Sequence, residues 1–377
     1  MTNITYVYSG NRKNRYYQKK YEAREFFYGL NLFDKENINL EIIEPKKNNF
    51  PPKIIFRYLD KIFQKIFNLP VYMNVFISFE NIKILLKTDK LILVNETTYC
   101  SLAPLLLIIK LFKRIDIYVF AMGLYSKKLR FPILKKLHFF IIKLFNLSVK
   151  KIMFLGEGEL KKALKIHKTN KNKFILFPFS VDTEFWNDPH HDKTHIEDTI
   201  LFVGNDGNRN SELFLEVVDN LKEINFVAIT NIENLLNAKR PNLNVVKGSF
   251  GSSNLSDTEL KQYYLSSKLV ILPLKESSQP SGQSVTLQAL SCGTQVIISD
   301  TEGFWDRNNF KNNKNIYFVK ENNYKSWSNK INQVLSDEKN LKITQKQGQE
   351  LVFNMYTLEN FKHKLFEIIE LNNNIVN

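Results

Sequence analysis

The sequence has few cysteines and no long uncharged apolar run. Only Cys100 and Cys292 occur among 377 residues, which excludes a small disulfide-rich framework. Lysines interrupt every apolar run well before the roughly 18 residues of a membrane-spanning helix, so none is predicted. The chain begins with a strand-like segment instead of a signal-peptide pattern, and we therefore expect a reducing, cytoplasmic environment.

Several sequence motifs of metal and phosphate chemistry are also missing. There is no P-loop lysine motif, and no closely spaced Asp–X–Asp pair that would anchor a sugar nucleotide through a metal. His190, His191 and His195 lie in a polar stretch without nearby cysteines, and we interpret that stretch as a solvated linker instead of a zinc site. We therefore expect neither a metal nor another cofactor.

Positive charge is concentrated in the first half of the chain. Residues 1–190 contain 33 Lys and Arg against 16 Asp and Glu, whereas the remaining residues contain 20 against 22. Between Asp116 and Glu157 there are eight basic residues and no acidic one. This asymmetry indicates that an anionic partner contacts the first half.

Strand-like and helix-like segments alternate through both halves, which predicts two α/β domains with parallel sheets and a cleft between them. Amphipathic segments between the strands predict helices, among them 21–28 and 357–371. We expect a first domain over 1–187, a linker over 188–198, a second domain over 199–356, and a C-terminal helix over 357–377 that can pack back on the first domain. The predicted strands are 4–8, 39–44, 91–94, 116–120, 151–155, 174–177, 199–203, 226–229, 243–246, 269–274, 294–298 and 315–319.

The stretch from Lys268 to Asp300 predicts a strand, a polar loop, a helix and a second strand. In open α/β sheets, ligands bind where such a loop leaves the carboxyl end of a strand, and the free N–H groups of the following helix attract phosphate. This pattern favours a phosphate-containing ligand on the four residues 281–284, although an ordinary turn would have the same pattern. These residues are Ser281, Gly282, Gln283 and Ser284.

A second loop of this kind spans 204–210, between a predicted strand and a predicted helix. Gly204 and Gly207 allow close approach to the backbone, and Arg209 can pair with phosphate oxygens through two nitrogens. A surface turn with a solvated arginine is the alternative. Two phosphate-type loops in one domain suit a nucleoside diphosphate.

Two segments of the basic half, 53–67 and 127–147, combine an apolar side with a basic side. We interpret them as elements that contact an anionic membrane surface, which would make the protein peripheral on the inner face of the cell membrane. The alternative is a pair of core helices with basic exposed sides. Nucleic acid is not expected as a partner, because no recognisable binding module is present.

Three stretches resemble the family-4 retaining glycosyltransferases. The resemblance implies a GT-B fold, with two Rossmann-like α/β/α domains facing a central cleft. It also implies transfer of a sugar, with retention, from a nucleoside-diphosphate sugar to a glycan or lipid-linked glycan in surface polysaccharide or lipopolysaccharide biosynthesis. The similar stretches are KIMFLGEGELKKALKIHKTNKNKFILFPFSVDTEFW, ILFVGNDGNRNSELFLEVV and PSGQSVTLQALSCGTQVIISD.

The chain departs from this family at the E–x7–E motif, where Pro280 and Gln288 stand in place of the two glutamates. The resemblance implies that Gln288 binds the donor ribose and that Arg209 stabilises the leaving diphosphate. A non-catalytic GT-B homologue that acts as a membrane-associated partner subunit is the alternative. The implied donor-binding residues are Gly204, Asn205, Arg209, Glu276, Ser281, Gly282, Gln283, Ser284 and Gln288. On the acceptor side we expect Gly10, Arg12 and Gly123, with Glu96 as a catalytic group that orients the acceptor.

Overall fold

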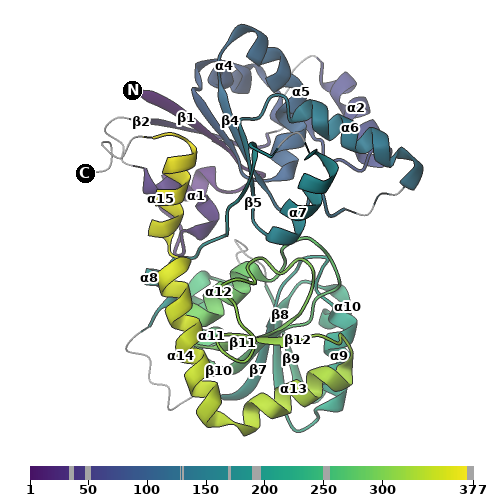
Figure 1. Cartoon of the computed structure of the whole chain (residues 1–377), viewed down its shortest axis with the longest axis vertical. Coiled ribbons are helices and arrows are strands. Elements are labelled where there is room, and N and C mark those ends of the chain that lie inside the picture. Colours follow the sequence, from purple (N-terminus) through teal and green to yellow (C-terminus); the bar gives the residue numbers. More distant parts are fainter. Residues whose placement is uncertain are drawn as a thin grey trace. The chain divides into compact units, whose positions relative to one another are not determined.

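The computed structural model describes residues 1–33, 38–46, 52–127, 129, 131–168, 171–188, 197–248 and 255–371. The chain forms two compact units, each with a parallel six-stranded sheet and flanking helices (Figure 1). The prediction of two α/β domains is confirmed. The first unit contains Met1–Tyr21, Phe27–Phe177 and Lys362–Asn377, and the second contains Glu22–Phe26 and Pro178–Phe361.

The sheet of the first unit has the strand order β2-β1-β3-β4-β5-β6. Because helices cover the sheet, its central strands are apolar on both faces; Ile117 to Ala121 of β4, for example, are all buried. The strands are β1 (Thr2–Val7), β2 (Ile38–Ile43), β3 (Lys90–Leu93), β4 (Asp116–Ala121), β5 (Lys151–Phe154) and β6 (Phe174–Leu176). The helices are α1 (Lys13–Tyr17), α2 (Lys53–Lys65), α3 (Met73–Phe76), α4 (Phe79–Lys87), α5 (Glu96–Phe112), α6 (Lys135–Phe145) and α7 (Glu157–Ile166). The last helix, α15 (Leu358–Ile368), begins among residues of the second unit and ends among those of the first.

The sheet of the second unit has the order β12-β11-β10-β7-β8-β9, so the strand order reverses direction between β10 and β7. Such a switch point is where open α/β sheets bind ligands. The strands are β7 (Glu197–Val203), β8 (Asn225–Thr230), β9 (Leu243–Lys247), β10 (Ser267–Leu272), β11 (Gln295–Ser299) and β12 (Tyr317–Val319). The helices are α8 (Thr183–Trp186), α9 (Ser211–Asn220), α10 (Glu233–Leu236), α11 (Asp257–Ser266), α12 (Gln283–Ser291), α13 (Tyr324–Ser336) and α14 (Glu338–Met355).

The predicted helix over 21–28 is wrong. Residues Glu25–Phe27 form a single 3-10 turn, and the helix of this region lies earlier, at α1. The reason is tertiary, because residues 22–26 pack into the second unit and the side chains of Arg24 and Glu25 bind partners there. These contacts hold the backbone on a path that helix periodicity does not describe.

The helix α14 was missed by the sequence pattern. Its buried side consists of Leu341, Thr344, Gly348 and Val352, which have helical spacing but include only two large apolar residues. The apolar periodicity is therefore weak, and packing decides that this segment is helical.

The proposed domain boundaries stay predictions, and most of the predicted linker, residues 189–196 with its three histidines, lies outside the described residues. Among the described residues, no helix has the length and apolar character needed to cross a membrane. In the same part of the chain, no cluster of three or more His, Cys, Asp or Glu side chains is arranged to hold a metal ion.

Candidate functional site

The two glycine-containing loops of the second unit meet at the switch point of its sheet. Arg209 and Leu274 form an isolated antiparallel bridge, and the N–H of Lys275 donates to the carbonyl of Asn208 at 2.8 Å. The side-chain amide of Asn208 also donates to the Ser281 hydroxyl at 2.7 Å. The loop after β7 and the loop after β10 therefore form one structure.

A cavity of about 340 Å³ lies beside these loops, within the second unit. Its size is at the lower end of the range typical of small-ligand pockets, about 300–1,000 Å³. The carboxyl ends of β7, β8 and β9 and the first turns of α11 and α12 form its walls. The lining residues are Phe26, Val203, Gly204, Asn205, Asp206, Arg209, Ile229, Gly248, Leu255, Asp257, Leu260, Ser284, Val285 and Gln288.

Arg209 is the buried cation of this cavity, with only 4% of its surface exposed. Its Nε donates to the carbonyl of Val203 at 3.0 Å, and its Nη1 pairs with the Asp206 carboxylate at 2.8 Å. The guanidinium lies against Gly204, where an added Cβ would stand 2.2 Å from Nε. Gly204 is thus required both by its φ of +149° and by the space that Arg209 occupies.

Asn205 holds the ends of three strands together. Its Nδ2 donates to the carbonyl of Gly248 at 2.9 Å, and its Oδ1 accepts from the backbone N–H of Asn231 and from the Thr230 hydroxyl. The side chain lines the cavity, but its hydrogen-bonding groups already have partners. Its structural contribution is to fix the floor of the cavity.

Gly282 is the N-cap residue of α12, has a left-handed φ of +76° and gives the helix no side-chain cap. Ser284 and Val285, in the first turn, line the cavity. The N–H groups of a first helical turn have no intrahelical partner and favour an anion. This end of the cavity therefore suits a phosphate group.

Gln288 lies one turn further along α12 and is 4% exposed. Its Oε1 accepts from the Tyr264 hydroxyl at 3.1 Å, and its Nε2 donates to Oε1 of Glu25 at 2.8 Å. The same carboxylate oxygen accepts from Nε1 of Trp186 at 2.9 Å. Burial raises the pKa of Glu25 to about 7, against the lowering effect of these hydrogen bonds.

Of the nine predicted donor-binding residues, five line the cavity and four do not. Gly204, Asn205, Arg209, Ser284 and Gln288 belong to the lining. Ser281, Gly282 and Gln283 form the junction between the loop and α12, next to the lining residues. Glu276 is exposed and accepts from the backbone N–H of Glu302 at 2.8 Å, which fixes the loop after β10 to the segment after β11.

Sequence reasoning missed Asp206 and Glu25. Asp206 lies three residues before Arg209, so the ion pair could have been expected from the spacing. Glu25 is separated from Gln288 by 263 residues, and no local pattern connects them.

The predicted acceptor-side residues all belong to the first unit, at the carboxyl ends of three neighbouring strands. Gly10 follows β1, Glu96 begins α5 after β3, and Gly123 follows β4. Nη1 of Arg12 donates to the carbonyl of Gly10 at 2.8 Å, and the backbone N–H of Arg12 donates to the Glu44 carboxylate.

Two carboxylates lie near this edge with buried oxygen atoms that have no partner among the described residues. These atoms are Oε2 of Glu96 and Oε2 of Glu159. The other oxygen of Glu159 accepts from the N–H of Tyr125 at 2.8 Å. Burial raises the pKa of Glu159 to about 8, and the charge of Glu96 adds to the effect.

Comparison with known proteins identifies a family pattern in the second unit. Residues 187–351 match the model of the family described as Glycosyl transferases group 1. This segment contains both loops, Arg209 and the whole of α12. The search among curated protein sequences gave no match.

Solved structures share the fold over the whole chain at low sequence identity. Anabaena HepE in complex with UDP and glucose has a TM-score of 0.68 at 8% identity, covering 99% of this chain and 100% of that one. A glycosyltransferase from Rickettsia africae has a TM-score of 0.65 at 14% identity, with 100% and 98% covered. Sucrose-phosphate synthase from Thermosynechococcus elongatus has 0.65 at 12%, with 98% of each chain covered. The pair of parallel six-stranded sheets is thus that of the GT-B fold.

Proposed function

We propose that this protein is a retaining glycosyltransferase, which moves a sugar from a nucleoside-diphosphate sugar to a hydroxyl group of a glycan or lipid-linked glycan. The observation that carries this proposal is the cavity at the switch point of the second sheet, with Arg209 and the start of α12 in its lining. Support comes from the family match over residues 187–351, and from HepE, which was crystallised with UDP and with UDP-glucose. The resemblance of the sequence suggests surface polysaccharide or lipopolysaccharide biosynthesis as the setting.

In this proposal the donor diphosphate binds between Arg209 and the first turn of α12. When the bond between the sugar and the diphosphate breaks, its electron pair stays on the diphosphate, and the guanidinium and the helix N–H groups stabilise that charge. The acceptor oxygen bonds to the sugar and its proton passes to the departing diphosphate. The Asp206 carboxylate keeps the Arg209 guanidinium oriented before the donor binds. When the donor binds, its diphosphate competes with Asp206 for the same guanidinium.

The remaining roles follow from the same arrangement. Gln288 offers its amide oxygen to a ribose hydroxyl, and Glu96 orients the acceptor hydroxyl in the first unit. Protein cations and a helix N-terminus replace a metal, so we expect turnover without one.

A thermal-shift screen with UDP, GDP, ADP and CMP tests the donor site. A nucleotide present at about 100 times its Kd stabilises the native state by about 2.7 kcal/mol, which raises the Tm by several degrees. We expect one base to give this shift, and Arg209→Ala to weaken its binding about 100-fold, because charge-assisted hydrogen bonds are lost.

Arg240→Ala is the matched control for that variant. Arg240 lies in the same unit and is paired with Asp219 at 2.7 Å, away from the cavity. If both arginine variants keep the shift of the wild type, the diphosphate does not bind at Arg209.

A second function is favoured by one specific observation. Both hydrogen-bonding groups of Gln288 already have protein partners, and Pro280 stands at the other glutamate position of the resembling family. The absence of both glutamates would be tolerated by a GT-B protein that binds a nucleotide without transferring sugar. Such a protein would act as a membrane-associated partner subunit. Nucleotide binding combined with no release of nucleoside diphosphate from any sugar nucleotide, with or without glycolipid acceptors, would favour this function over the transferase.

The proposal also places the first unit on an anionic membrane surface, which would make the protein peripheral on the cytoplasmic side. The helix α2 turns Phe56 and Phe63 toward the core, and its buried Asp60 accepts from the backbone N–H of Met73 at 2.8 Å. Ile54, at 67% exposed, and Tyr58, at 66%, lie on the other side. An amphipathic helix with an exposed apolar side and flanking cations binds anionic lipid surfaces.

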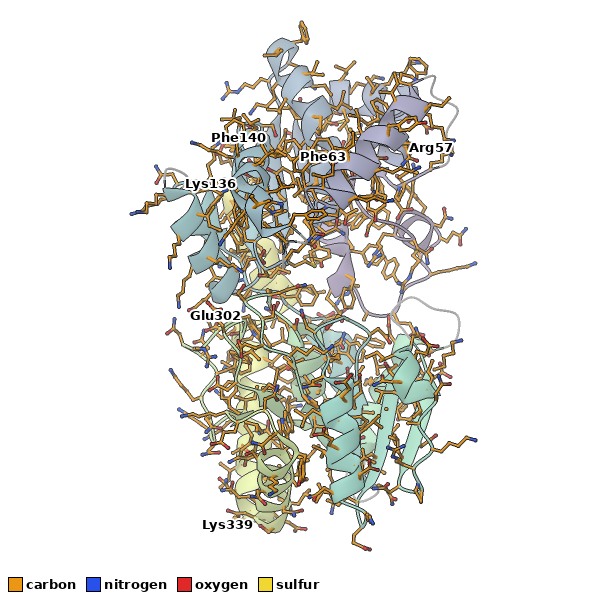
Figure 2. The ribbon with its side chains drawn as sticks, turned by 90° about the vertical axis from the view of Figure 1, so that its right-hand side faces the viewer. Arg57, Phe63, Lys136, Phe140, Glu302 and Lys339 are labelled. Carbon is orange, nitrogen blue, oxygen red and sulfur yellow. The ribbon has the colours of Figure 1, made fainter. Side chains whose placement is uncertain are left out.

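A second helix extends the same kind of surface. Phe140 of α6 is 53% exposed, and the helix also carries Lys135, Lys136 and Lys143. The two helices are neighbours, since the rings of Phe63 and Phe145 are 6.2 Å apart. Figure 2 shows Arg57 on α2 and Lys136 and Phe140 on α6, with Phe63 turned inward. The apolar positions on α2 are thus divided between the core and the surface.

A further inference from the structure

Residues 22–26 extend one wall of the cavity from a distant part of the sequence. The N–H of Ala23 donates to the Asp257 carboxylate at 3.3 Å, and the Glu22 carboxylate accepts from the N–H of Thr258 at 2.6 Å. Both contacts fix the segment to the start of α11, within the second unit. Phe26, the last residue of the segment, lines the cavity.

A second set of contacts fixes the segment to residues 179–186. Nη2 of Arg24 donates to the Asp182 carboxylate at 2.7 Å, and the ring of Phe26 lies 5.5 Å from that of Phe179. The segment is therefore held from two sides, which leaves Glu25 between them with 1% of its surface exposed.

The Glu25 carboxylate determines which way the amide of Gln288 points. Oε1 of Glu25 accepts from the indole N–H of Trp186, a group that can only donate, so the Gln288 group that shares this oxygen at 2.8 Å is the NH2 group. The indole N–H of Trp186 donates to the same carboxylate and fixes its position. The amide oxygen of Gln288 is consequently directed to the other side, where the Tyr264 hydroxyl uses one of its two lone pairs.

We propose that Glu25 is a positioning residue of the nucleotide site, which acts by fixing the amide of Gln288 so that its oxygen can accept from a ligand hydroxyl. Residues 22–26 thereby become part of the donor site, although they lie among residues of the first unit in the sequence. This inference rests on the proposed function, because the hydroxyl is that of the nucleotide ribose. Without the carboxylate, the amide of Gln288 can rotate and present its NH2 group instead.

Exchanging the two side chains separates positioning from folding. Glu25→Gln leaves two amides in contact, and Gln288→Glu brings two carboxylates together, so each single variant loses the fixed orientation. The double variant restores one carboxylate and one amide, now with the carboxylate on α12. Glu350→Gln is the control, since it removes the same charge from an exposed position of α14 in the second unit, outside the cavity lining.

The measurement is the Kd of the nucleotide selected from UDP, GDP, ADP and CMP by the thermal-shift screen, with thermal melting of every variant as the folding control. We expect each single variant to weaken binding about tenfold, the double variant to bind within about threefold of the wild type, and Glu350→Gln to be unchanged. If Glu25→Gln does not fold, the comparison of the double variant with Gln288→Glu decides alone.

Two results would overturn the inference in different ways. If folded Glu25→Gln binds as tightly as the wild type, or if the double variant stays as weak as the single ones, Glu25 does not position Gln288. If the wild type itself binds none of the nucleotides, the proposed function fails and the inference fails with it.

Discussion

The two units share one architecture but differ in what their surfaces expose. Of the 24 large apolar side chains that are exposed in the described part of the chain, 20 belong to residues 1–147 and four to residues 236–355. The first unit also carries the excess of positive charge. The second unit covers its apolar residues and contains the cavity with its buried arginine.

This difference shows that the same fold can specialise in two ways. Parallel sheets of six strands fix only the positions of the loops at the carboxyl ends of the strands, and the outer faces of the helices are free to vary. In the second unit, the loops supply residues of the cavity lining, and the helices expose few large apolar side chains. In the first unit the outer helix faces carry the unusual side chains. We propose that one unit binds a soluble nucleotide and the other a surface.

The largest expected effect is the pH dependence of stability, which differs between the two units. Glu25 and Glu159 are buried, and their pKa values are raised to about 7 and about 8. A raised carboxyl pKa means that the folded state binds the proton more tightly, so this stability is present below about pH 4.5 and is lost as the pH rises through the folded pKa. Across its window, the loss is on the order of 3 kcal/mol for Glu25 and on the order of 5 kcal/mol for Glu159.

The two windows differ, because between pH 7 and 8 only Glu159 continues to lose its proton. Urea unfolding at pH 5.5, 7 and 8 measures the loss, and tryptophan fluorescence reports the second unit, since Trp186, Trp305 and Trp327 all lie there. In the Glu25→Gln variant, the unfolding free energy followed by fluorescence should no longer fall between pH 5.5 and 7. In the Glu159→Gln variant, the unfolding free energy followed by far-UV circular dichroism should no longer fall between pH 7 and 8. If the pH dependence of the unfolding free energy is unchanged in both variants, Glu25 and Glu159 are not the groups that cause the loss.

The next largest effect breaks the cavity of the second unit. Gly204→Ala places a Cβ against the Arg209 side chain and in an unfavourable backbone region, so it should cost about 2–3 kcal/mol of unfolding free energy. It should also abolish the nucleotide-dependent thermal shift. Gly207→Ala is the control in the same loop, because a Cβ there meets open space. Equal behaviour of the two alanine variants would show that Gly204 has no special role.

A smaller effect tests the surface of the first unit. Replacing Ile54 and Tyr58 with serine removes exposed apolar area from α2 without touching the core, and should weaken binding to vesicles of phosphatidylglycerol and phosphatidylethanolamine about tenfold. Ile343→Ser, on an exposed position of α14 in the second unit, should leave vesicle binding unchanged. Cosedimentation measures both. If both variants keep the vesicle binding of the wild type, or if both lose it equally, the proposed difference between the units does not exist.

The smallest expected effect is that of metal removal, which should leave the turnover unchanged. If Arg209 and α12 stabilise the leaving diphosphate, EDTA should leave the turnover of a sugar nucleotide unchanged, as measured by release of nucleoside diphosphate. Loss of turnover with EDTA, restored by a divalent cation, would assign that charge to a metal instead.

Local patterns predicted the sheets well, because strands with buried faces need continuous apolar runs. The predicted strand at 226–229 is β8, Asn225–Thr230, and the predicted loop at 204–210 lies between β7 and α9 and contacts the loop after β10. The strand and the loop each depend on residues that are close in sequence, and the two loops meet because β7 and β10 are neighbouring strands of the sheet.

Features that depend on distant residues were not predictable from one sequence. The contact of Glu25 with Gln288 requires the segment 22–26 to join the second unit, and helix periodicity indicated a different structure there. The side chains of α2 show the same limit, since the segment 53–67 was expected to have one apolar side, whereas Phe63 packs on the core and Tyr58 is exposed. The sequence indicates which residues are apolar, but tertiary packing decides which of them are covered.

The central claim is that the second unit binds the nucleotide at the junction of its two loops. Hydrogen–deuterium exchange with and without the selected nucleotide tests this claim most directly, because it locates the ligand along the chain. We predict slower exchange in peptides that cover 203–210 and 281–288, with no change at Gly10 or Gly123. Protection confined to the loops of the first unit, or none anywhere at saturating nucleotide, would contradict it.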